Sequence, residues 1–335
     1  MDTGESTLVQ LALIDNHTMT DNSYNRNGEF EITTNTNENV YVENGILYIK
    51  PTLQDASLVE TDGAVINLLA DGSCSSTLYS DCVAVTNTTN GTIVNPVKSG
   101  RVNTKLGANI RYGRVEVEAK LPAGDWLWPA IWMLPTDAVY GAWPRSGEID
   151  IMESRGNNYT YPQGGNNIVS STLHWGPVAS EDGWYRNNVK RQALHTTYAA
   201  GFNTFGVEWS EKYIFSYINS RLLQVMYVNF NEPFWTKGNF PSSTSNGTSL
   251  SNPWVGGTDS TPFDQNFYLI LNVAVGGTNG WFQDNVEGKP WVDTAANAPL
   301  EFWNARNTWY PTWKEGGAMQ VKSVKMWQQQ GHNGC

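Results

Sequence analysis

Three carboxylates alternate with aliphatic residues between Glu148 and Glu153, in the run Glu-Ile-Asp-Ile-Met-Glu. A run this apolar predicts a β-strand, and Glu148 and Asp150 would share one of its faces because side chains alternate along a strand. Carboxylates on one face repel each other, so the cluster indicates a chemical role. The reaction that best explains it is cleavage of a glycosidic bond, which uses two carboxyl groups with separated pKa values.

The third carboxylate, Glu153, lies five residues after Glu148, which is out of phase with a period of two. A β-bulge of one extra residue at Ile151 or Met152 would restore the phase and bend the strand. We therefore predict a bulge that turns Glu153 to the side of the other two acids.

Tryptophans crowd the segment just before these acids, at Trp126, Trp128, Trp132 and Trp143. Aromatic faces stack on flat ligands, and the apolar faces of sugar rings are one such ligand. The acid spacing alone is a weak signal, because it can arise by chance in an acidic chain. The tryptophans that precede the acids strengthen the prediction of a sugar-binding site.

The composition favours one β-sheet domain with many tight turns: 335 residues include 31 glycines and 15 tryptophans, and only 16% are charged. The sequence shows no linker, low-complexity segment or internal repeat, so we expect residues 1–335 to form a single domain and a monomer. The net charge of −11 argues against nucleic acid or an anionic membrane as partner. It is compatible with a neutral polysaccharide, although solubility alone would also explain it.

Sequons and cysteines suggest a secreted, extracellular glycoprotein. Five Asn-x-Ser/Thr sequons occur, at Asn16, Asn87, Asn90, Asn158 and Asn246. Cys74 and Cys82 close a short loop and could form a disulfide in an oxidising compartment, which leaves Cys335 without an assigned partner. No apolar run reaches the roughly 18 residues of a membrane span.

Strand signals dominate the chain. Strands are expected at 40–42 and 46–49 (a hairpin turning at 43–45), 114–121, 205–209, 213–218, 222–228, 268–275 as a central strand, and 319–327 closing a sheet. We interpret 71–99 as an irregular surface insertion and 155–168, 176–192 and 236–264 as loops. This pattern predicts an all-β fold, an antiparallel two-sheet jelly-roll sandwich whose bent sheets leave a concave cleft for a long ligand.

The segment 128–135 followed by 147–153 resembles glycoside hydrolase family sixteen, and is most similar to laminarinase-type endo-β-1,3-glucanases and related β-glucan recognition proteins. Further segments at 101–105, 112–117, 173–175, 205–209 and 271–277 resemble the family in its order, whereas the first hundred residues match more loosely. The resemblance implies a β-jelly-roll with the cleft on its concave sheet and cleavage with retention of configuration.

By this resemblance, Glu148 would be the nucleophile, Glu153 the general acid and base, and Asp150 a neighbour that hydrogen-bonds Glu148 and adjusts its charge. The residues themselves require one ionised and one protonated carboxyl group, with nearby negative charge raising the pKa of the acid. The residue types alone do not tell which glutamate is the nucleophile and which is the acid. They also do not give the stereochemistry, which depends on the separation of the carboxyl groups.

The resemblance also points to substrate-binding residues. Trp132 and Trp143 resemble tryptophans beside the scissile bond, although Trp132 lies in an apolar run and is also a candidate core residue. His174 resembles a family histidine near the acid/base, while a lone histidine is more often structural. Arg101 and Asn103 share one strand face and would either bond sugar hydroxyls or simply cover the sheet.

A glycine-rich loop carries Trp281 to the expected edge of the cleft, and Trp175, Asn272 and Arg155 are weaker candidates. Many relatives have an acid in the last strand that helps to hold calcium, but residues 319–327 contain none. A calcium ion needs several oxygen ligands, so we expect no bound metal and no cofactor.

Three functions fit these residues. The first is a secreted retaining endo-glycosidase that hydrolyses β-1,3-glucan of the laminarin kind, with mixed β-1,3/1,4-glucan as a further substrate. The second is a non-catalytic β-glucan-binding recognition protein on the same fold, and the third is a transglycosylase. Binding-only relatives have commonly lost one or both catalytic acids, and all three acids are present here, which favours an enzyme.

Overall fold

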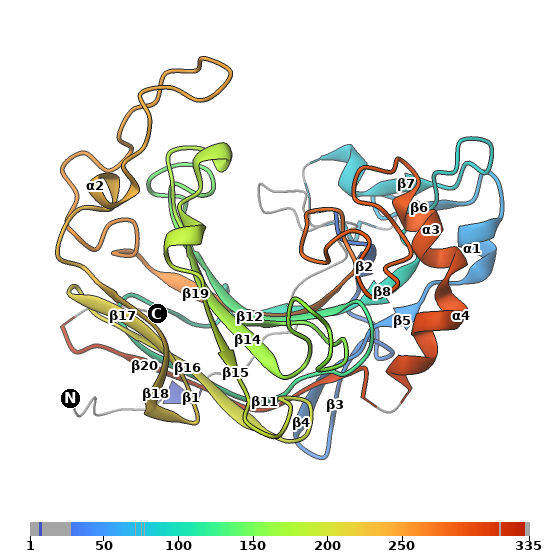
Figure 1. Cartoon of the computed structure of the whole chain (residues 1–335), viewed down its shortest axis with the longest axis horizontal. Coiled ribbons are helices and arrows are strands. Elements are labelled where there is room, and N and C mark those ends of the chain that lie inside the picture. The colour runs from blue at the N-terminus through green and yellow to red at the C-terminus, as the bar shows by residue number, and fades with distance from the viewer. Residues whose placement is uncertain are drawn as a thin grey trace.

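Two antiparallel sheets form the body of the protein, one above the other in Figure 1, so the predicted all-β jelly-roll class is confirmed. The computed structural model describes residues 7–8, 28–70, 72–74, 76, 78–314 and 316–331. Asn16 and Cys335, named above as a sequon and a leftover cysteine, lie outside the described residues.

The outer sheet has eight strands and forms the lower layer in Figure 1. Its order is β18 (Ser220–Asn229), β17 (Tyr213–Ile218), β16 (Asn203–Trp209), β11 (Gly113–Lys120), β20 (Met319–Gln328), β4 (Ile46–Ile49) and β3 (Val40–Glu43), with β1 (Thr7–Leu8) also paired to β20. The strand predicted to close a sheet, β20, instead lies inside this one, because alternation tells which face is buried but not which strands are neighbours.

The inner sheet has seven strands and faces the cleft. Its order is β10 (Asn109–Ile110), β19 (Phe267–Val275), β12 (Leu127–Pro135), β13 (Glu148–Ser154), β14 (Ile168–His174) and β15 (Val189–Gln192), with β9 (Arg101–Asn103) also paired to β19. The expected central strand, β19, is therefore interior, and β13 with its acids lies between β12 and β14.

Two apolar faces meet between the sheets. In β11, Val115, Val117 and Ala119 are fully buried while the alternate residues are half-exposed, as the strict alternation of the strand predicts. The segment β3–β4 turns at Asn44 and Gly45, which both have positive φ (51° and 76°), the backbone that a two-residue hairpin of matching twist requires.

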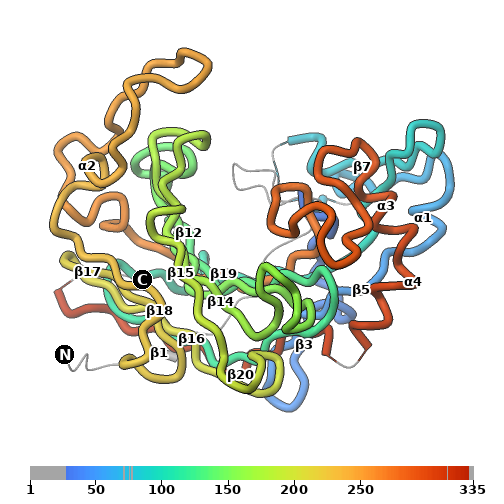
Figure 2. Tube along the Cα trace, in the orientation of Figure 1, coloured from blue at the N-terminus to red at the C-terminus, as the bar shows by residue number. Residues whose placement is uncertain are grey.

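Smaller elements lie beside the two sheets. They are β2 (Glu31–Thr33), β5 (Thr52–Leu53), β6 (Val65–Asn67), β7 (Val83–Val85), β8 (Val97–Ser99), α1 (Ala56–Glu60), α2 (Phe234–Gly238), α3 (Ala298–Asn304) and α4 (Arg306–Trp309), with 3₁₀ turns η1 (Tyr79–Asp81), η2 (Ala179–Glu181), η3 (Trp184–Arg186) and η4 (Tyr310–Trp313). The chain trace in Figure 2 shows the arm with α2 on one side and the arm with α1, α3 and α4 on the other.

Two loop predictions need correction. The segment 71–99 is not wholly irregular, because β7 pairs with β6, β8 pairs with β2 and β5, and Val94 and Val97 are buried. The segment 176–192 ends in the edge strand β15, whose four residues are all exposed and so show no alternation. A solvated edge strand carries little hydrophobic signal.

Several surface predictions can be compared with the structure. Cys74 and Cys82 form the predicted disulfide, and the asparagines of four sequons, Asn87, Asn90, Asn158 and Asn246, are exposed. Among the helices of the described residues, none has the length and apolar character needed to cross a membrane.

Candidate active site

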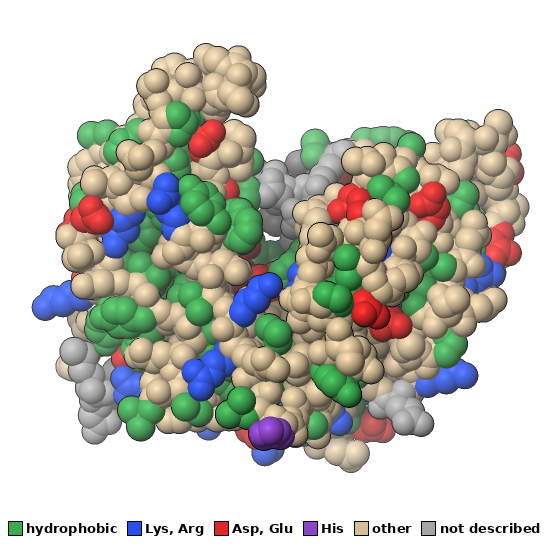
Figure 3. All heavy atoms as spheres, viewed as in Figure 1, with side chains coloured by type: hydrophobic (Ala, Val, Ile, Leu, Met, Phe, Trp, Pro, Cys, Tyr) green, Lys and Arg blue, Asp and Glu red, His purple; other side chains and the backbone are tan. Residues whose placement is uncertain are grey.

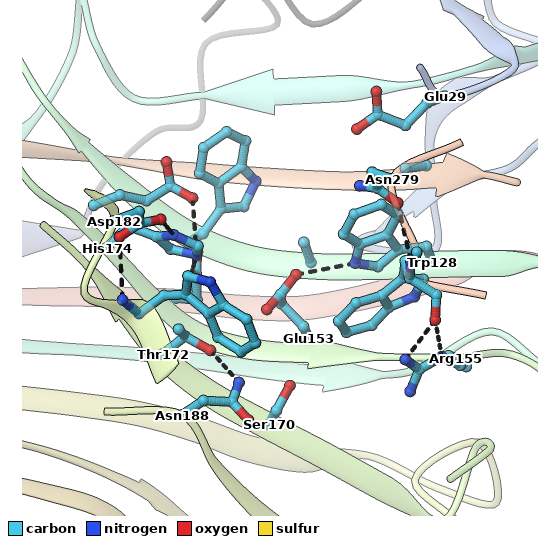
Figure 4. A pocket seen from close by; sticks show the side chains of 18 of the residues that line it. Glu29, Trp128, Glu153, Arg155, Ser170, Thr172, His174, Asp182, Asn188 and Asn279 are labelled. Atoms are coloured by element: carbon cyan, nitrogen blue, oxygen red, sulfur yellow. Dashed lines mark hydrogen bonds and ion pairs between the residues drawn. The ribbon is translucent and has the colours of Figure 1, made fainter. Parts of the chain in front are cut away.

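A cavity of about 590 Å³ opens on the cleft face of the inner sheet. All three predicted acids line it, together with Trp128, Trp132, Trp143, His174, Asn272 and Trp281. Figure 3 shows the surface hollowed between the two arms, and Figure 4 shows Glu153 between His174 with Asp182 at one end and Arg155 with Asn279 at the other.

The predicted bulge is present and explains how the third acid reaches the cleft. Asp150 and Glu153 pair with Thr172 and Ser170, so three steps along β13 match two steps along β14. Ile151 and Met152 are both buried in the core, at 3% and 0% exposure. Because two successive side chains point to the core, Glu153 returns to the cleft face.

Each glutamate has an indole hydrogen-bond partner. Trp143 Nε1 donates to Glu148 Oε2 at 2.8 Å, and Trp128 Nε1 donates to Glu153 Oε1 at 3.0 Å. Sequence reasoning did not single out Trp128 as a site residue. The available signal was its parity with Trp132 on β12, which places both side chains on the cleft face.

His174 lies among carboxylates. Its Nε2 is 3.1 Å from Asp150 Oδ2 and 4.0 Å from Glu148 Oε1, and its Nδ1 is 2.5 Å from Asp182 Oδ2. Burial lowers the pKa of His174, but Glu148, Asp150 and Asp182 together hold that pKa well above its ordinary value. These carboxylates therefore favour the positively charged ring.

The two glutamates have similar surroundings, which raise the pKa of both. Burial and the neighbouring Asp150 raise the pKa of Glu153 to about 8, against the opposing effects of His174 and Trp128. Burial and Asp150 also raise the pKa of Glu148, which His174 and the Trp143 N–H oppose. Once Glu153 holds a proton it no longer repels Glu148, which keeps the nearby imidazolium as counter-ion. The arrangement can thus present one acid and one carboxylate.

An aromatic and cationic stack forms the wall beside Glu153. The rings of Trp128 and Trp281 are stacked, with centroids 4.5 Å apart and planes 10° apart. The Arg155 guanidinium carbon is 4.1 Å from the Trp281 ring centroid, and Arg155 Nη2 donates to the Trp281 carbonyl at 2.6 Å. The structure therefore brings the predicted Trp281 and the weaker candidate Arg155 to the cavity.

Trp132 is both a cavity-lining residue and a packed apolar residue, the two roles that its sequence allowed. It lines the cavity with 7% of its surface exposed, and it also belongs to a small apolar cluster with Tyr268 and Ile270. Its Nε1 donates to Asn272 Oδ1 at 2.7 Å, which places Asn272 in the cavity wall as well.

Three candidates lie outside the cavity lining. Arg101 and Asn103 are on β9, with β19 and β12 between them and the acids, and the Arg101 guanidinium lies over the Trp132 ring, 4.8 Å from its centroid. Trp175 is 1% exposed and packs against Phe234, because it follows His174 on the opposite face of the chain.

Sequence reasoning missed several groups in the loop after β14. Asp182 and Trp184 line the cavity, and Trp184 is 45% exposed. Asn188, from the same segment, donates to Thr172 Oγ1 at 2.8 Å on the cavity floor. Nothing local in an irregular polar segment distinguishes these residues, since their roles depend on His174 and β14.

Glu148, Asp150 and His174 bring donor atoms within 4.8 Å of one another, close enough to consider a metal ion. The surrounding carboxylates favour the imidazolium form of His174, which has no free lone pair for a ligand bond. The set fits an imidazolium–carboxylate network.

Comparisons with known proteins agree with this geometry. The model of the family "Glycosyl hydrolases family 16" matches residues 55–268. A β-1,3-glucan-binding protein of Penaeus monodon is 40% identical over 314 residues, which cover 90% of this chain and 83% of that protein. The glucan endo-1,3-β-glucosidase A1 of Niallia circulans is 34% identical over 254 residues, which cover 75% of this chain but 29% of that protein.

A solved structure, the laminarinase catalytic domain of Thermotoga maritima, has a similar fold, with a TM-score of 0.55, 20% identity, and coverage of 97% of this chain and 99% of that one. The family match over residues 55–268 includes the acid-bearing strand β13. The chain belongs to glycosyl hydrolase family 16.

Proposed function

We propose that this protein is a secreted, retaining endo-β-1,3-glucanase that acts on laminarin-like glucan and also on mixed β-1,3/1,4-glucan. The observation that carries the proposal is the pair Glu148 and Glu153, which line one cavity and accept hydrogen bonds from separate indole N–H groups. Burial and Asp150 raise the pKa of both, so that the pair can keep one proton, and glycosidases need one ionised and one protonated carboxyl group.

In the first step, Glu153 gives its proton to the glycosidic oxygen while the Glu148 carboxylate attacks the anomeric carbon. The bond from that carbon to the departing oxygen breaks, and an ester bond to Glu148 forms. In the second step, ionised Glu153 takes a proton from water, the water oxygen attacks the anomeric carbon, and the ester bond breaks. Trp143 and His174 would hold the Glu148 carboxylate in place for the attack.

The open cleft favours attack within a long chain. Its hollow runs between the two arms in Figure 3, and indole side chains lie at both ends of the carboxylate row, Trp132 and Trp143 near Glu148 and the Trp128–Trp281 stack near Glu153. Sugar rings would stack on exposed indole faces on either side of the scissile bond.

A second candidate function is β-glucan recognition without catalysis. The observation in its favour is that the relative from Penaeus monodon, which is 40% identical, is named a β-1,3-glucan-binding protein. The same carboxylates would also serve a transglycosylase, in which a sugar hydroxyl replaces water in the second step. In every case we propose that residues 1–335 act as one domain and as a monomer, outside the cell, which the disulfide and exposed sequons support.

Product analysis separates these functions. Wild type, Glu148→Gln and Glu153→Gln would be incubated with laminarin, lichenan, xyloglucan and agarose, and the released oligosaccharides analysed. Glu208→Gln is a matched control, since Glu208 bonds Tyr213 and Arg221 on the outer sheet. We expect wild type and the control to release oligosaccharides from laminarin and the two site variants to bind it without cleavage. Binding by wild type with no cleavage of any glucan would favour recognition, and full activity of Glu148→Gln would refute the catalytic assignment.

A further inference from the structure

The carboxylate of Asp182 makes three contacts that link the loop after β14 to the active-site charges. Its Oδ2 is 2.5 Å from His174 Nδ1, and its Oδ1 accepts backbone N–H bonds from Trp175 and Trp184, each at 3.1 Å. The side chain of Asp182 is only 7% exposed. Its orientation is therefore set by the backbone and does not depend on His174 alone.

The loop that carries Asp182 is closely folded against the end of β14. Gly183 N–H donates to the Trp175 carbonyl at 2.7 Å, and a Cβ at Gly183 would come within 2.9 Å of the Trp175 ring. A larger residue would push the turn away. Glycine at this position lets the turn hold the Asp182 carboxylate at the outer nitrogen of His174.

Both ring nitrogens of His174 lie near carboxylate oxygens: Nδ1 is hydrogen-bonded to Asp182 Oδ2, and Nε2 is 3.1 Å from Asp150 Oδ2. A neutral imidazole has one N–H and one lone pair, so one of these carboxylates would face a lone pair. The charged ring has an N–H at both nitrogens and is attracted to both carboxylates. These contacts therefore favour the imidazolium.

We propose that Asp182 is a positioning residue that keeps His174 as a correctly oriented imidazolium, so that the ring supports the buried carboxylates Glu148 and Asp150. Asp182 does not reach the reacting atoms; it acts through His174. The same carboxylate also fixes the backbone of Trp184, whose exposed side chain lines the cavity, so that the sugar-facing wall and the charge network share one anchor. The effect on turnover rests on the proposed hydrolase function, whereas the effect on the charge of His174 does not.

Asp182→Asn separates the charge from the anchoring. An asparagine oxygen still accepts the two backbone N–H bonds, but the amide that faces Nδ1 carries no negative charge. Glu181→Gln is the matched control, because it removes a charge from the same turn and is not among the carboxylates within 4.0 Å of the His174 ring. The charged groups that remain around His174 are Glu148 and Asp150, with Glu153 farther along β13.

The direct measurement is the titration of the ring by ¹H–¹⁵N NMR of imidazole signals, with His174 assigned among the four histidines by its loss in His174→Gln. We expect wild-type His174 to show two ring N–H groups at pH 7. We expect its pKa in Asp182→Asn to fall by about one unit or more, the size of shift that one charge at this distance produces, and to stay unchanged in Glu181→Gln. A wild-type ring with one N–H at pH 7, or a pKa unmoved in Asp182→Asn, would overturn the proposal. The first of these readings does not depend on the folding of Asp182→Asn.

Activity supplies the second readout. A loss of one pKa unit of imidazolium stabilisation corresponds to about a tenfold effect on a charge-dependent rate. We therefore expect kcat on laminarin to fall about tenfold in Asp182→Asn with KM little changed. An unchanged kcat despite a shifted His174 pKa would overturn the positioning role. If wild type cleaves no glucan, the hydrolase function fails while the ring titration still decides the charge state.

Discussion

Replacing Trp128 by Phe tests whether the indole N–H sets the working range of the proposed acid. Trp128 Nε1 donates to Glu153 Oε1 at 3.0 Å, and this bond favours the ionised form of Glu153. Phe keeps an aromatic ring for the stack with Trp281 but has no donor. The pKa of Glu153, about 8 in the intact site, should therefore rise.

The size of the shift follows from the strength of the bond. A hydrogen bond to a charged group contributes about 1.5–3 kcal/mol, and one pKa unit corresponds to 1.36 kcal/mol. The full loss would raise the pKa of Glu153 by about 1–2 units, and water entering the space left by the indole would reduce this to about 1 unit. The proton that Glu153 must donate would then persist to higher pH.

The assay is the pH dependence of kcat/KM on laminarin between pH 5 and 10, with reducing ends as the readout. We expect the alkaline limb near pH 8 in wild type and about one unit higher in Trp128→Phe. Trp281→Phe controls for the damaged stack, since it alters the same aromatic pair without touching the Glu153 carboxylate. A limb that stays in place, or that moves to lower pH, would refute the reasoning.

Three further predictions follow from other contacts. Lys289 is fully buried and bonds Asp284 and Asp293, so Lys289→Met should lower the free energy of unfolding in urea by about 2–4 kcal/mol; a loss below 1 kcal/mol would contradict it. The pKa of Glu153 is raised in the folded state, so its stabilising effect is present below its unfolded pKa and is lost as pH rises toward 8. Glu153→Gln should therefore raise Tm more at pH 8 than at pH 5, and an equal difference at both pH values would count against this. Trp184→Ala should raise KM for laminarin about threefold to tenfold with kcat kept, because an exposed ring in the cleft contributes about 1 kcal/mol; an unchanged KM would show that the ring does not contact sugar.

Local patterns in the chain predicted much of the fold. Alternation marked β11 as a strand with one buried face, and Asn44-Gly45 marked the β3–β4 turn. The spacing of the acids along β13 predicted the bulge. Side chains alternate with a period of two, so two acids five residues apart can share a face only if the strand has an extra residue. Edge strand β15 left no such trace, since all its residues face water.

The site was predictable where neighbours are close in sequence, and less so where they are not. Trp143 and Glu148 are five residues apart and bond each other, whereas the Trp128–Trp281 stack joins β12 to a distant loop. For Arg101 the sequence left open a bond to sugar or a place on the sheet surface; in the structure β19 and β12 separate β9 from the acids, and Arg101 lies over the Trp132 ring. Strand order in a sheet is a global property, which alternation within one strand does not contain.

By itself, the sequence determined which residues could do chemistry: Glu148, Asp150 and Glu153 on one face of a bulged strand, with tryptophans before them. The tertiary structure decided the electrostatic surroundings of these carboxylates. Burial of the site, the imidazolium of His174 and the anchor at Asp182 come from separate segments brought together by folding. Periodicity and turn chemistry act between near neighbours and are readable in the chain, but a pKa depends on every charge and apolar group that surrounds it in space.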